Sequence, residues 1–282
     1  MSEPASETIL QRYSAIGISP RLVQLFAAIT AVSSLTILLG MPGLTGPVIV
    51  VFIPTVTAVI LIRVSAGLGQ ASHLLFSGAA WRVSLLWTVT SLGLALVLRV
   101  GVSVVGTVVI SDYEFHPGVF TPLLAGILVF AAGEEIGWRG FGLPALLARG
   151  YSPLAATAML GVPWALLHLP LARAGSLNEG WSMWALFLFM MAMSVLVSWV
   201  YLASGFSITS AVLFHGGQNV LAVLNDGIDP LSGGWVMAVV YGLAAILVLI
   251  LTKGRLGMPP SEDPTPSSMV SEPISLSEKE RA

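Results

Sequence analysis

The sequence predicts an all-α fold, a polytopic membrane bundle of about eight transmembrane helices with both termini in the cytoplasm. Hydrophobic residues make up 56% of the 282 residues and charged residues only 9%, whereas a soluble globular domain has about 25% charged residues. The apolar residues gather in long runs, each close to the roughly 20 residues that a helix needs to cross the hydrocarbon core. Strands of a membrane barrel would instead alternate apolar and polar residues over about 10 positions. No such alternation occurs, so the spans are predicted to be helices.

Eight apolar segments follow one another along the chain. They cover residues 22–40, 44–64, 83–106, 119–138, 153–169, 181–203, 207–224 and 233–252. The fourth and fifth are the least regular, and Pro163 and Pro170 break or kink the fifth. The backbone groups that these prolines free must be satisfied within the protein or around a cavity. Residues 140–150 are predicted to connect the two spans, and the whole transmembrane domain is predicted to cover residues 22–253.

Three segments outside the spans differ in composition. Residues 1–21 are polar and mixed in charge, which predicts a cytoplasmic N-terminal segment rather than a signal peptide. Residues 65–82 are too broken by glycine to span; we expect them at the cytoplasmic membrane interface, with a simple loop as the alternative. Residues 254–282 are rich in Pro, Ser and Glu, which is typical of a disordered tail, here on the cytoplasmic side.

The basic residues of the short loops predict the orientation in the membrane. With an even number of spans, both termini lie on one side. The basic residues on that side are Arg12, Arg21, Arg63, Arg82, Arg149, Lys253 and Arg255. Only Arg99 and Arg173 are expected on the opposite side. The side of the termini is therefore predicted to be cytoplasmic, and we expect a multi-pass protein of a bacterial or archaeal cell membrane.

The composition and the missing motifs exclude several classes of protein. The chain has no cysteine, which excludes disulfide frameworks, thiol nucleophiles and cysteine metal sites. Its formal net charge of -2 provides no basic patch, so no nucleic-acid partner is expected. No Gly-x-Ser-x-Gly or Walker A sequence supports a serine hydrolase or a nucleotide-driven pump. No internal repeat supports an inverted-repeat transporter.

The segment GEEIGWRG, residues 133–140, places three charged residues in or beside the fourth span. A charge at the centre of a bilayer costs about 2.5–3.5 kcal/mol and usually faces a bundle interior or a wet cavity. If the helix continues, Glu135 and Arg139 form an i,i+4 pair on one face, and Glu134 points about 100° away. Arg139 then holds Glu135 as an orienting group and leaves Glu134 as a base. A salt bridge at a helix end, with no chemistry, is the alternative.

Two histidines and an asparagine lie in later spans. Trp164 and His168 are four residues apart and share a helix face, and so do His215 and Asn219. A lone histidine in an apolar helix is more often a packing residue than a catalyst. Two of them, together with Asn219, predict one buried polar pocket shared with the charged residues of the fourth span.

The depth of these residues presents a difficulty for such a pocket. If the fourth helix ends near residue 138, Glu134 lies near its cytoplasmic end. His168 lies roughly 22 Å along a fifth helix that begins near Pro153, at about 1.5 Å per residue. A later start of the fifth helix, a bend at Pro163 or a fourth helix that runs past Arg139 would each remove the conflict.

The predicted pocket is suited to hydrolysis. A carboxylate held away from bulk water binds a proton more readily, which suits a general base that takes a proton from water. N–H groups of histidine and asparagine can donate to the oxyanion that forms when water attacks an amide. The same side chains could instead hold zinc, which needs three protein ligands and a water at a catalytic site, although the sequence has no HExxH pairing. Buried Glu and His also form proton relays, so proton-coupled transport is a further alternative.

Three motifs together resemble those of the CPBP family of intramembrane proteases, which includes the CAAX prenyl endopeptidases and the bacteriocin-processing and immunity proteins. The motifs and their matches are EExxxR with Glu134, Glu135 and Arg139, FxxxH with Trp164 and His168, and HxxxN with His215 and Asn219. Tryptophan replaces the phenylalanine that is usual in the second motif. The resemblance covers roughly residues 119–224, a family-like catalytic core.

The resemblance implies a role for each matched residue. Glu134 activates the hydrolytic water with help from His168, His215 and Asn219 stabilise the oxyanion, and Glu135 and Arg139 support the site. It also implies a membrane-embedded or lipid-modified peptide or protein as substrate, met within the lipid bilayer. Family members have been interpreted both as metalloproteases and as metal-free glutamate enzymes, and the lack of a zinc motif favours an enzyme with no cofactor. A non-proteolytic scaffold or bacteriocin-immunity protein is the alternative function.

Overall fold

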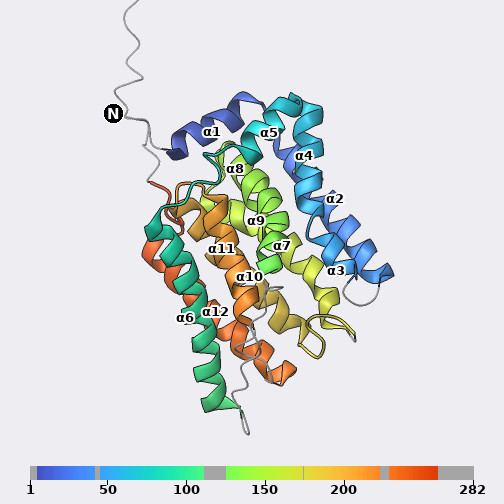
Figure 1. Ribbon diagram of the computed structural model, residues 1–282, viewed down its shortest axis with the longest axis vertical. Helices are drawn as coiled ribbons and strands as arrows, with labels where there is room; N and C mark the ends of the chain where they lie inside the picture. The colour runs from blue at the N-terminus through green and yellow to red at the C-terminus, as the bar shows by residue number, and fades with distance from the viewer. Residues whose placement is uncertain (1–4, 42–44, 111–124, 174, 223–228, 260–282) are drawn as a thin grey trace, which may run out of the picture.

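The computed structural model describes residues 5–41, 45–110, 125–173, 175–222 and 229–259, and within these ranges the chain forms helices and no strand. Figure 1 shows a bundle with α1 (Ala5–Ala15) and α5 (Leu68–Phe76) lying across one end. We call this the α1 end, and we call the end that carries the 173–182 loop and the start of α12 the opposite end. The predicted all-α bundle is confirmed.

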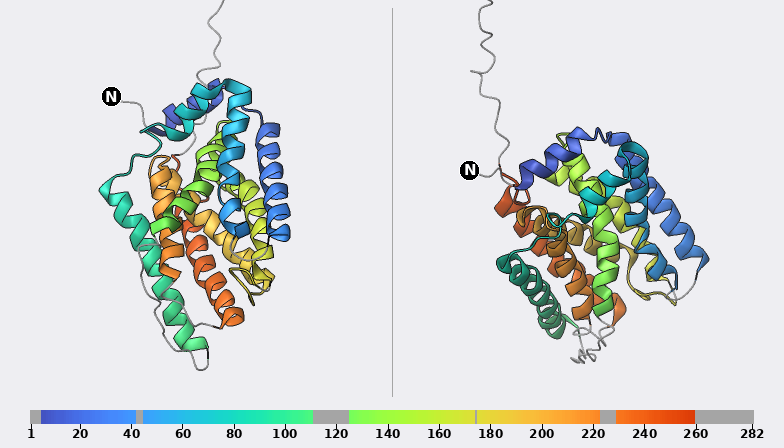
Figure 2. Two further views of the ribbon diagram at one scale, coloured as in Figure 1. Left: turned by 45° about the vertical axis from the view of Figure 1, so that its right-hand side comes forward. Right: turned by 45° about the horizontal axis from the view of Figure 1, so that its top comes forward.

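The other described helices form the body of the bundle. They are α2 (Pro20–Gly40), α3 (Thr45–Val50), α4 (Ile53–Ala66), α6 (Leu85–Val109), α7 (Ala125–Glu135), the π-helix η2 (Ile136–Gly142), α8 (Leu143–Leu147), α9 (Pro153–His168), the 3-10 helix η3 (Leu169–Ala172), α10 (Met183–Ala203), α11 (Ile208–Val220) and α12 (Pro230–Thr252). α11 packs against α6 and α7, and α10 packs against α9 and α12. Figure 2 shows α6 along one side of this arrangement.

Six described helical stretches are long and apolar enough to cross a membrane, which makes this a multi-pass membrane protein. They are α2, α3 with α4, α6, α9 with η3, α10 and α12. The predicted span at 207–224 contains α11, which is only 13 residues long. The predicted span at 119–138 begins outside the described residues. The bundle therefore confirms six spans of the eight that the sequence predicted.

Side-chain caps set where many of these helices begin. Ser19, Ser84, Ser152 and Ser207 each accept a hydrogen bond from the backbone N–H three residues on, at 3.2, 3.3, 3.2 and 3.2 Å, and all four lie at the α1 end. Asp229 caps α12 at the opposite end through the Ser232 N–H at 2.8 Å. Such oxygens satisfy N–H groups that the first helical turn leaves without partners. Proline follows the cap in α2, α9 and α12, where its fixed φ suits the first turn.

The helix that carries the EExxxR motif runs on past Arg139. α7, η2 and α8 follow one another without a break from Ala125 to Leu147. The predicted connector at 140–150 is therefore wrong over 140–147, and the predicted end at 138 is too early. This removes the depth conflict, because Glu134 lies in the middle of a long helical stretch while α9 begins at Pro153 as predicted.

Side chains from distant helices bond the backbone within the π-helical stretch and just before it. A π-helix shifts the hydrogen-bond ladder and is frequent at functional sites. The Thr55 hydroxyl of α4 donates to the Gly133 carbonyl at 2.6 Å, and the Tyr13 hydroxyl of α1 donates to the Gly140 carbonyl. Tyr13 thus bonds η2 itself and Thr55 bonds the turn before it, and all seven residues of η2 are buried.

Glycine at position 137 lets α4 pack directly on η2. A Cβ added at Gly137 would lie 2.4 Å from the Pro54 carbonyl carbon and 2.5 Å from its oxygen. Gly137→Ala is therefore expected to destabilise the protein by about 1–3 kcal/mol or more through overpacking, seen as a lower unfolding temperature in detergent. Gly126→Ala is the matched control in α7, because nothing lies within 4 Å of a Cβ there. Equal stability of the two variants would contradict this account of the contact.

The N-terminal segment is folded onto the same helical stretch. Tyr13 is 2% exposed, and Arg149, just after α8, donates from Nε to the Ile18 carbonyl at 2.6 Å. Burial raises the pKa of Tyr13, so its hydroxyl keeps the proton that it donates to Gly140. Within the predicted N-terminal segment 1–21, the described residues 5–21 are thus a packed part of the protein, which the composition alone did not indicate.

Removing the Tyr13 hydroxyl tests this attachment. Tyr13→Phe leaves the buried Gly140 carbonyl without its donor, which costs about 1–3 kcal/mol. We expect a lower unfolding temperature in detergent for this variant. Ser14→Ala serves as the control, because the Ser14 hydroxyl makes an exposed contact of 3.4 Å with the Ala148 carbonyl. A Tyr13→Phe protein as stable as Ser14→Ala would show that the hydroxyl adds nothing.

The two remaining predicted segments differ from simple loops. Within 65–82, Gly67 at φ 88° separates α4 from the helix α5, whose residues Ala71, Leu74 and Leu75 are buried. After α12, Leu256 is fully buried and Gly257 packs against Ala203. The predicted disordered tail from 254 therefore begins with packed residues, and its part from 260 onward lies outside the described residues.

Candidate active site

The two adjacent glutamates face different surroundings. Glu135 is fully buried, and its Oε1 accepts hydrogen bonds from Arg139 Nη1 at 3.2 Å and from His215 Nδ1 at 2.8 Å. Glu134 is 9% exposed, lines the main cavity and accepts from Trp164 Nε1 at 2.6 Å. The two carboxylates diverge as the helical spacing predicts, and Glu135 forms an ion pair with Arg139 in the predicted i,i+4 register.

Arg139 lies behind the cavity rather than on its wall. It is 3% exposed, and its Nη2 donates to the Ser194 hydroxyl of α10 at 3.3 Å. Its guanidinium carbon lies 4.5 Å from the centre of the Trp164 ring, a favourable cation–π geometry. The sequence carried no signal for Ser194, which is an ordinary small residue of an apolar helix.

Trp164 connects four of the candidate residues. Besides its contacts with Glu134 and Arg139, its backbone carbonyl accepts from His168 Nδ1 at 2.7 Å. Its ring makes edge-to-face contacts with His168 at 5.3 Å and with His215 at 5.6 Å between ring centroids. A phenylalanine could make the ring contacts, but it has no N–H for Glu134. The motif comparison named this residue without revealing its polar role.

The hydrogen bonds also define the state of each histidine ring. A carbonyl oxygen only accepts, so His168 Nδ1 carries a proton and Nε2 of the neutral ring is an acceptor. His215 Nδ1 likewise donates to the carboxylate of Glu135. Each ring is therefore oriented through Nδ1, which leaves Nε2 for chemistry.

A cavity of about 580 Å³ collects four of the six candidate residues on its wall. They are Glu134, His168, His215 and Asn219. Asn219 is exposed, and it lies one helical turn after the buried His215 on α11. Much of the remaining wall is apolar, with Leu38, Val48, Ile127, Phe130 and Met190 among its residues. The structure thus brings all six predicted residues together, with Glu135 and Arg139 in the layer behind the cavity.

Arg99 is a further cavity residue. The sequence analysis counted it with the basic residues on the side opposite the termini, although it falls within the predicted span at 83–106. The structure places it inside α6, where it is 5% exposed. Its Nε donates to the Gln218 carbonyl at 2.9 Å, next to Asn219 in the last turn of α11. The Tyr241 hydroxyl donates to the Gln218 side chain. A charge inside an apolar run of 25 residues was the signal that could have revealed this buried position.

The described residues contain no group suited to a catalytic metal. In this part of the chain, no three His, Asp or Glu side chains form a group that could hold a metal ion. We therefore derive no step through zinc.

Fold and site together define a class: a multi-pass helical membrane protein with a carboxylate and histidine centre beside an apolar cavity. Residues 116–221 match the family model of the type II CAAX prenyl endopeptidase Rce1-like proteins. The chain is also 32% identical over 133 residues to CAAX prenyl protease 2 of Methanococcus maripaludis. This alignment covers 42% of the chain and 49% of the relative, so the chain spans about half the length of that protein. The predicted resemblance to the CPBP and CAAX protease family is confirmed over residues 116–221, which contain all six candidate residues.

Proposed function

We propose that this protein is an intramembrane endopeptidase that hydrolyses a peptide bond of a membrane-associated peptide or protein. The observation that carries the proposal is the division between the two glutamates. Glu134 lines the cavity, whereas Glu135 is bound by Arg139 and His215 behind it. The similarity to the CAAX prenyl endopeptidases supports the same reaction class.

The proposed reaction begins with water held between Glu134 and His168. The Glu134 carboxylate takes a proton as the water oxygen attacks the carbonyl carbon of the scissile bond. The His168 Nε2 atom, oriented by the bond from Nδ1 to Trp164, accepts the other water proton as a hydrogen bond. The proton on Glu134 then passes to the leaving nitrogen as the C–N bond breaks, which yields a carboxylic acid and an amine. Transfer of the remaining proton of the acid to the amine gives a carboxylate and an ammonium group.

The negative charge that develops on the carbonyl oxygen must be stabilised by hydrogen-bond donors. Asn219 lines the cavity and offers its side-chain N–H groups. The proton on His215 Nδ1 is donated to Glu135. His215 Nε2 therefore donates to the oxyanion only when the ring carries a second proton on Nε2. One such donor contributes about 10²–10³ in rate in well-studied hydrolases.

The apolar wall supports a substrate that is embedded in the membrane or carries a lipid. We propose a reaction without a metal cofactor, because the donor set offers no three-ligand group among the described residues. Purified enzyme should therefore keep its activity after dialysis against EDTA and 1,10-phenanthroline. Activity that is lost on dialysis and restored by zinc would overturn this part of the proposal.

The first experiment compares new peptide termini, by mass spectrometry, in membranes of cells that make the wild type or Glu134→Ala at matched levels. It requires no prior choice of substrate. Termini that appear only with the wild type would support proteolysis through Glu134 and would name the substrate. Identical termini at matched levels would favour a non-proteolytic scaffold or immunity role.

Trp164→Phe should lower kcat about ten- to a hundredfold, because a hydrogen bond to a charged carboxylate contributes about 1.5–3 kcal/mol and about 1.4 kcal/mol is tenfold in rate. The ring contacts with both histidines would remain. The measurement is cleavage of the identified substrate by purified protein. Trp199→Phe is the control, since Trp199 packs edge-to-face on Trp87, away from the cavity. Equal kcat for the two variants would show that the indole N–H is dispensable.

A further inference from the structure

The cavity extends from the site toward the opposite end of the bundle. Its inner part is formed by Glu134, Trp164 and His215, none more than 9% exposed. Its outer part includes Leu177, which is 58% exposed, and the exposed residues Asp229 and Pro230. Exposure of the lining residues thus rises from the site to the 173–182 loop and the start of α12.

The α1 end closes the cavity. Every residue of η2 is buried beneath the site, and α4 and α5 pack against η2. α1 packs against α8, and Tyr13 bonds the Gly140 carbonyl. None of the cavity-lining residues comes from α1, α5 or η2. Among the described residues, those that line the outer part of the cavity therefore all lie at the opposite end of the bundle.

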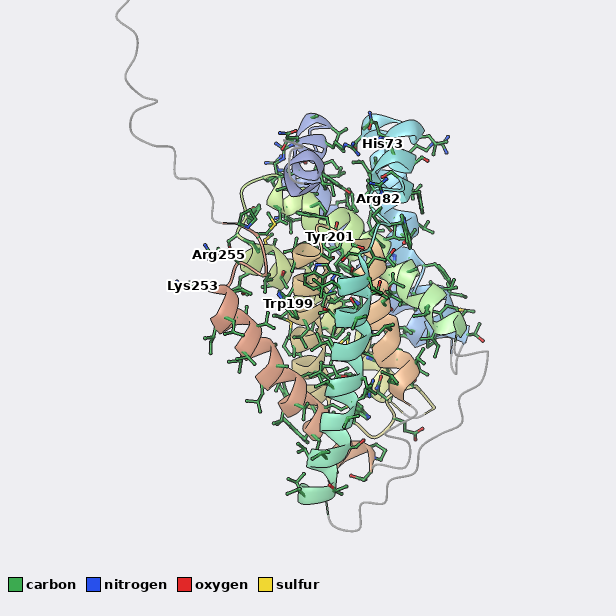
Figure 3. All side chains as sticks on the ribbon, turned by 60° about the vertical axis from the view of Figure 1, so that its left-hand side comes forward. His73, Arg82, Trp199, Tyr201, Lys253 and Arg255 are labelled. Carbon is green, nitrogen blue, oxygen red and sulfur yellow. The ribbon has the colours of Figure 1, made fainter. Side chains whose placement is uncertain are left out.

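The basic residues outside the bundle interior lie almost entirely at the α1 end. Those in the described part of the chain are Arg12, Arg21, Arg63, Arg82, Arg149, Lys253 and Arg255. Figure 3 shows Arg82, Lys253 and Arg255 on the half of the bundle that carries α1. The opposite end carries Arg173 together with the acidic residues Glu179 and Asp229. Arg99 is not among the loop residues of the opposite end, because it is buried inside α6.

We propose that this cavity opens on the extracytoplasmic side of the membrane. An excess of Lys and Arg in short loops marks the cytoplasmic side, which here is the α1 end. The cavity lies toward the other end. Substrates then reach Glu134 as polypeptide segments presented at the outer face, after translocation, rather than as cytoplasmic tails. This statement about substrates rests on the proposed function, whereas the statement about the cavity does not.

Cysteine labelling tests the side of the cavity directly, because the chain has no cysteine of its own. Leu177→Cys places one thiol at the outer part of the cavity, and Ser72→Cys places one on the exposed face of α5 at the α1 end. A membrane-impermeant sulfonated maleimide is added to intact spheroplasts, and detergent-permeabilised spheroplasts give the reference for complete labelling. We expect Leu177→Cys to be labelled in intact spheroplasts and Ser72→Cys only after permeabilisation.

The reverse pattern would overturn the proposal and place the cavity mouth in the cytoplasm. Labelling of both thiols in intact spheroplasts would show a mixed orientation and would also overturn it. The labelling needs no enzyme activity, so it decides the side of the cavity even if no proteolysis is found. If proteolysis is found, the new termini should belong to segments on the outer face, and termini in cytoplasmic segments would contradict the inferred substrate class.

Discussion

Replacing Glu134 with glutamine is expected to abolish peptide-bond cleavage while the protein stays folded in the membrane. The amide oxygen of glutamine can still accept the hydrogen bond that Trp164 Nε1 donates at 2.6 Å. The amide cannot take a proton from water, and a general base typically contributes about 10²–10⁴ in rate. Glu134 has no ion-pair partner among the described residues, so removing its charge leaves no described cation unpaired.

Two measurements on the same sample check this expectation. Cleavage of the substrate identified from wild-type membranes should fall to the detection limit. The unfolding temperature in detergent should match that of the wild type. Glu134→Asp is a useful companion, because it keeps a carboxylate but withdraws it by one methylene, and it should retain a fraction of the activity. A Glu134→Gln enzyme that cleaves at the wild-type rate would exclude Glu134 as the base.

Replacing Glu135 with glutamine is expected to have the opposite primary effect, a loss of stability. Glu135 is fully buried and its carboxylate is bound by Arg139 and His215. Removing the charge of one partner from a buried pair costs about 3–5 kcal/mol, because the other charge is left uncompensated. Arg139, at 3% exposed, would be that charge.

The matched control for Glu135→Gln is Glu134→Gln, the same chemical change one residue earlier. Accumulation in membranes and the unfolding temperature in detergent should separate the two variants. If both unfold at the wild-type temperature, the ion pair with Arg139 contributes no net stability. If both are destabilised alike, the two glutamates do not have the distinct environments that the contacts indicate.

Hydropathy and spacing in the sequence predicted much of the fold and the candidate residues that the structure brings together. Six apolar runs form helices long enough to cross a membrane. Lipid offers no hydrogen-bond partners, so the backbone of an apolar segment must satisfy its hydrogen bonds internally, as a helix does. The helical repeat separated Glu134 from Glu135 and paired Glu135 with Arg139. These are local properties, which neighbouring residues determine by themselves.

Tertiary structure decided the features that depend on residues far apart in the chain. The helix continues past Arg139 as a π-helix. Tyr13 of α1 bonds its Gly140 carbonyl, and Thr55 of α4 bonds the Gly133 carbonyl just before it. Trp164 becomes the donor to Glu134 only because α9 packs beside the cavity, and Arg99 became a buried residue because α11 presents the Gln218 carbonyl to it. Hydropathy measures how favourably a segment is placed in lipid. It does not predict which distant donor forms a hydrogen bond with a given backbone or carboxylate oxygen. That choice follows from packing, and it determines both the geometry around Glu134 and the end of the bundle toward which the cavity extends.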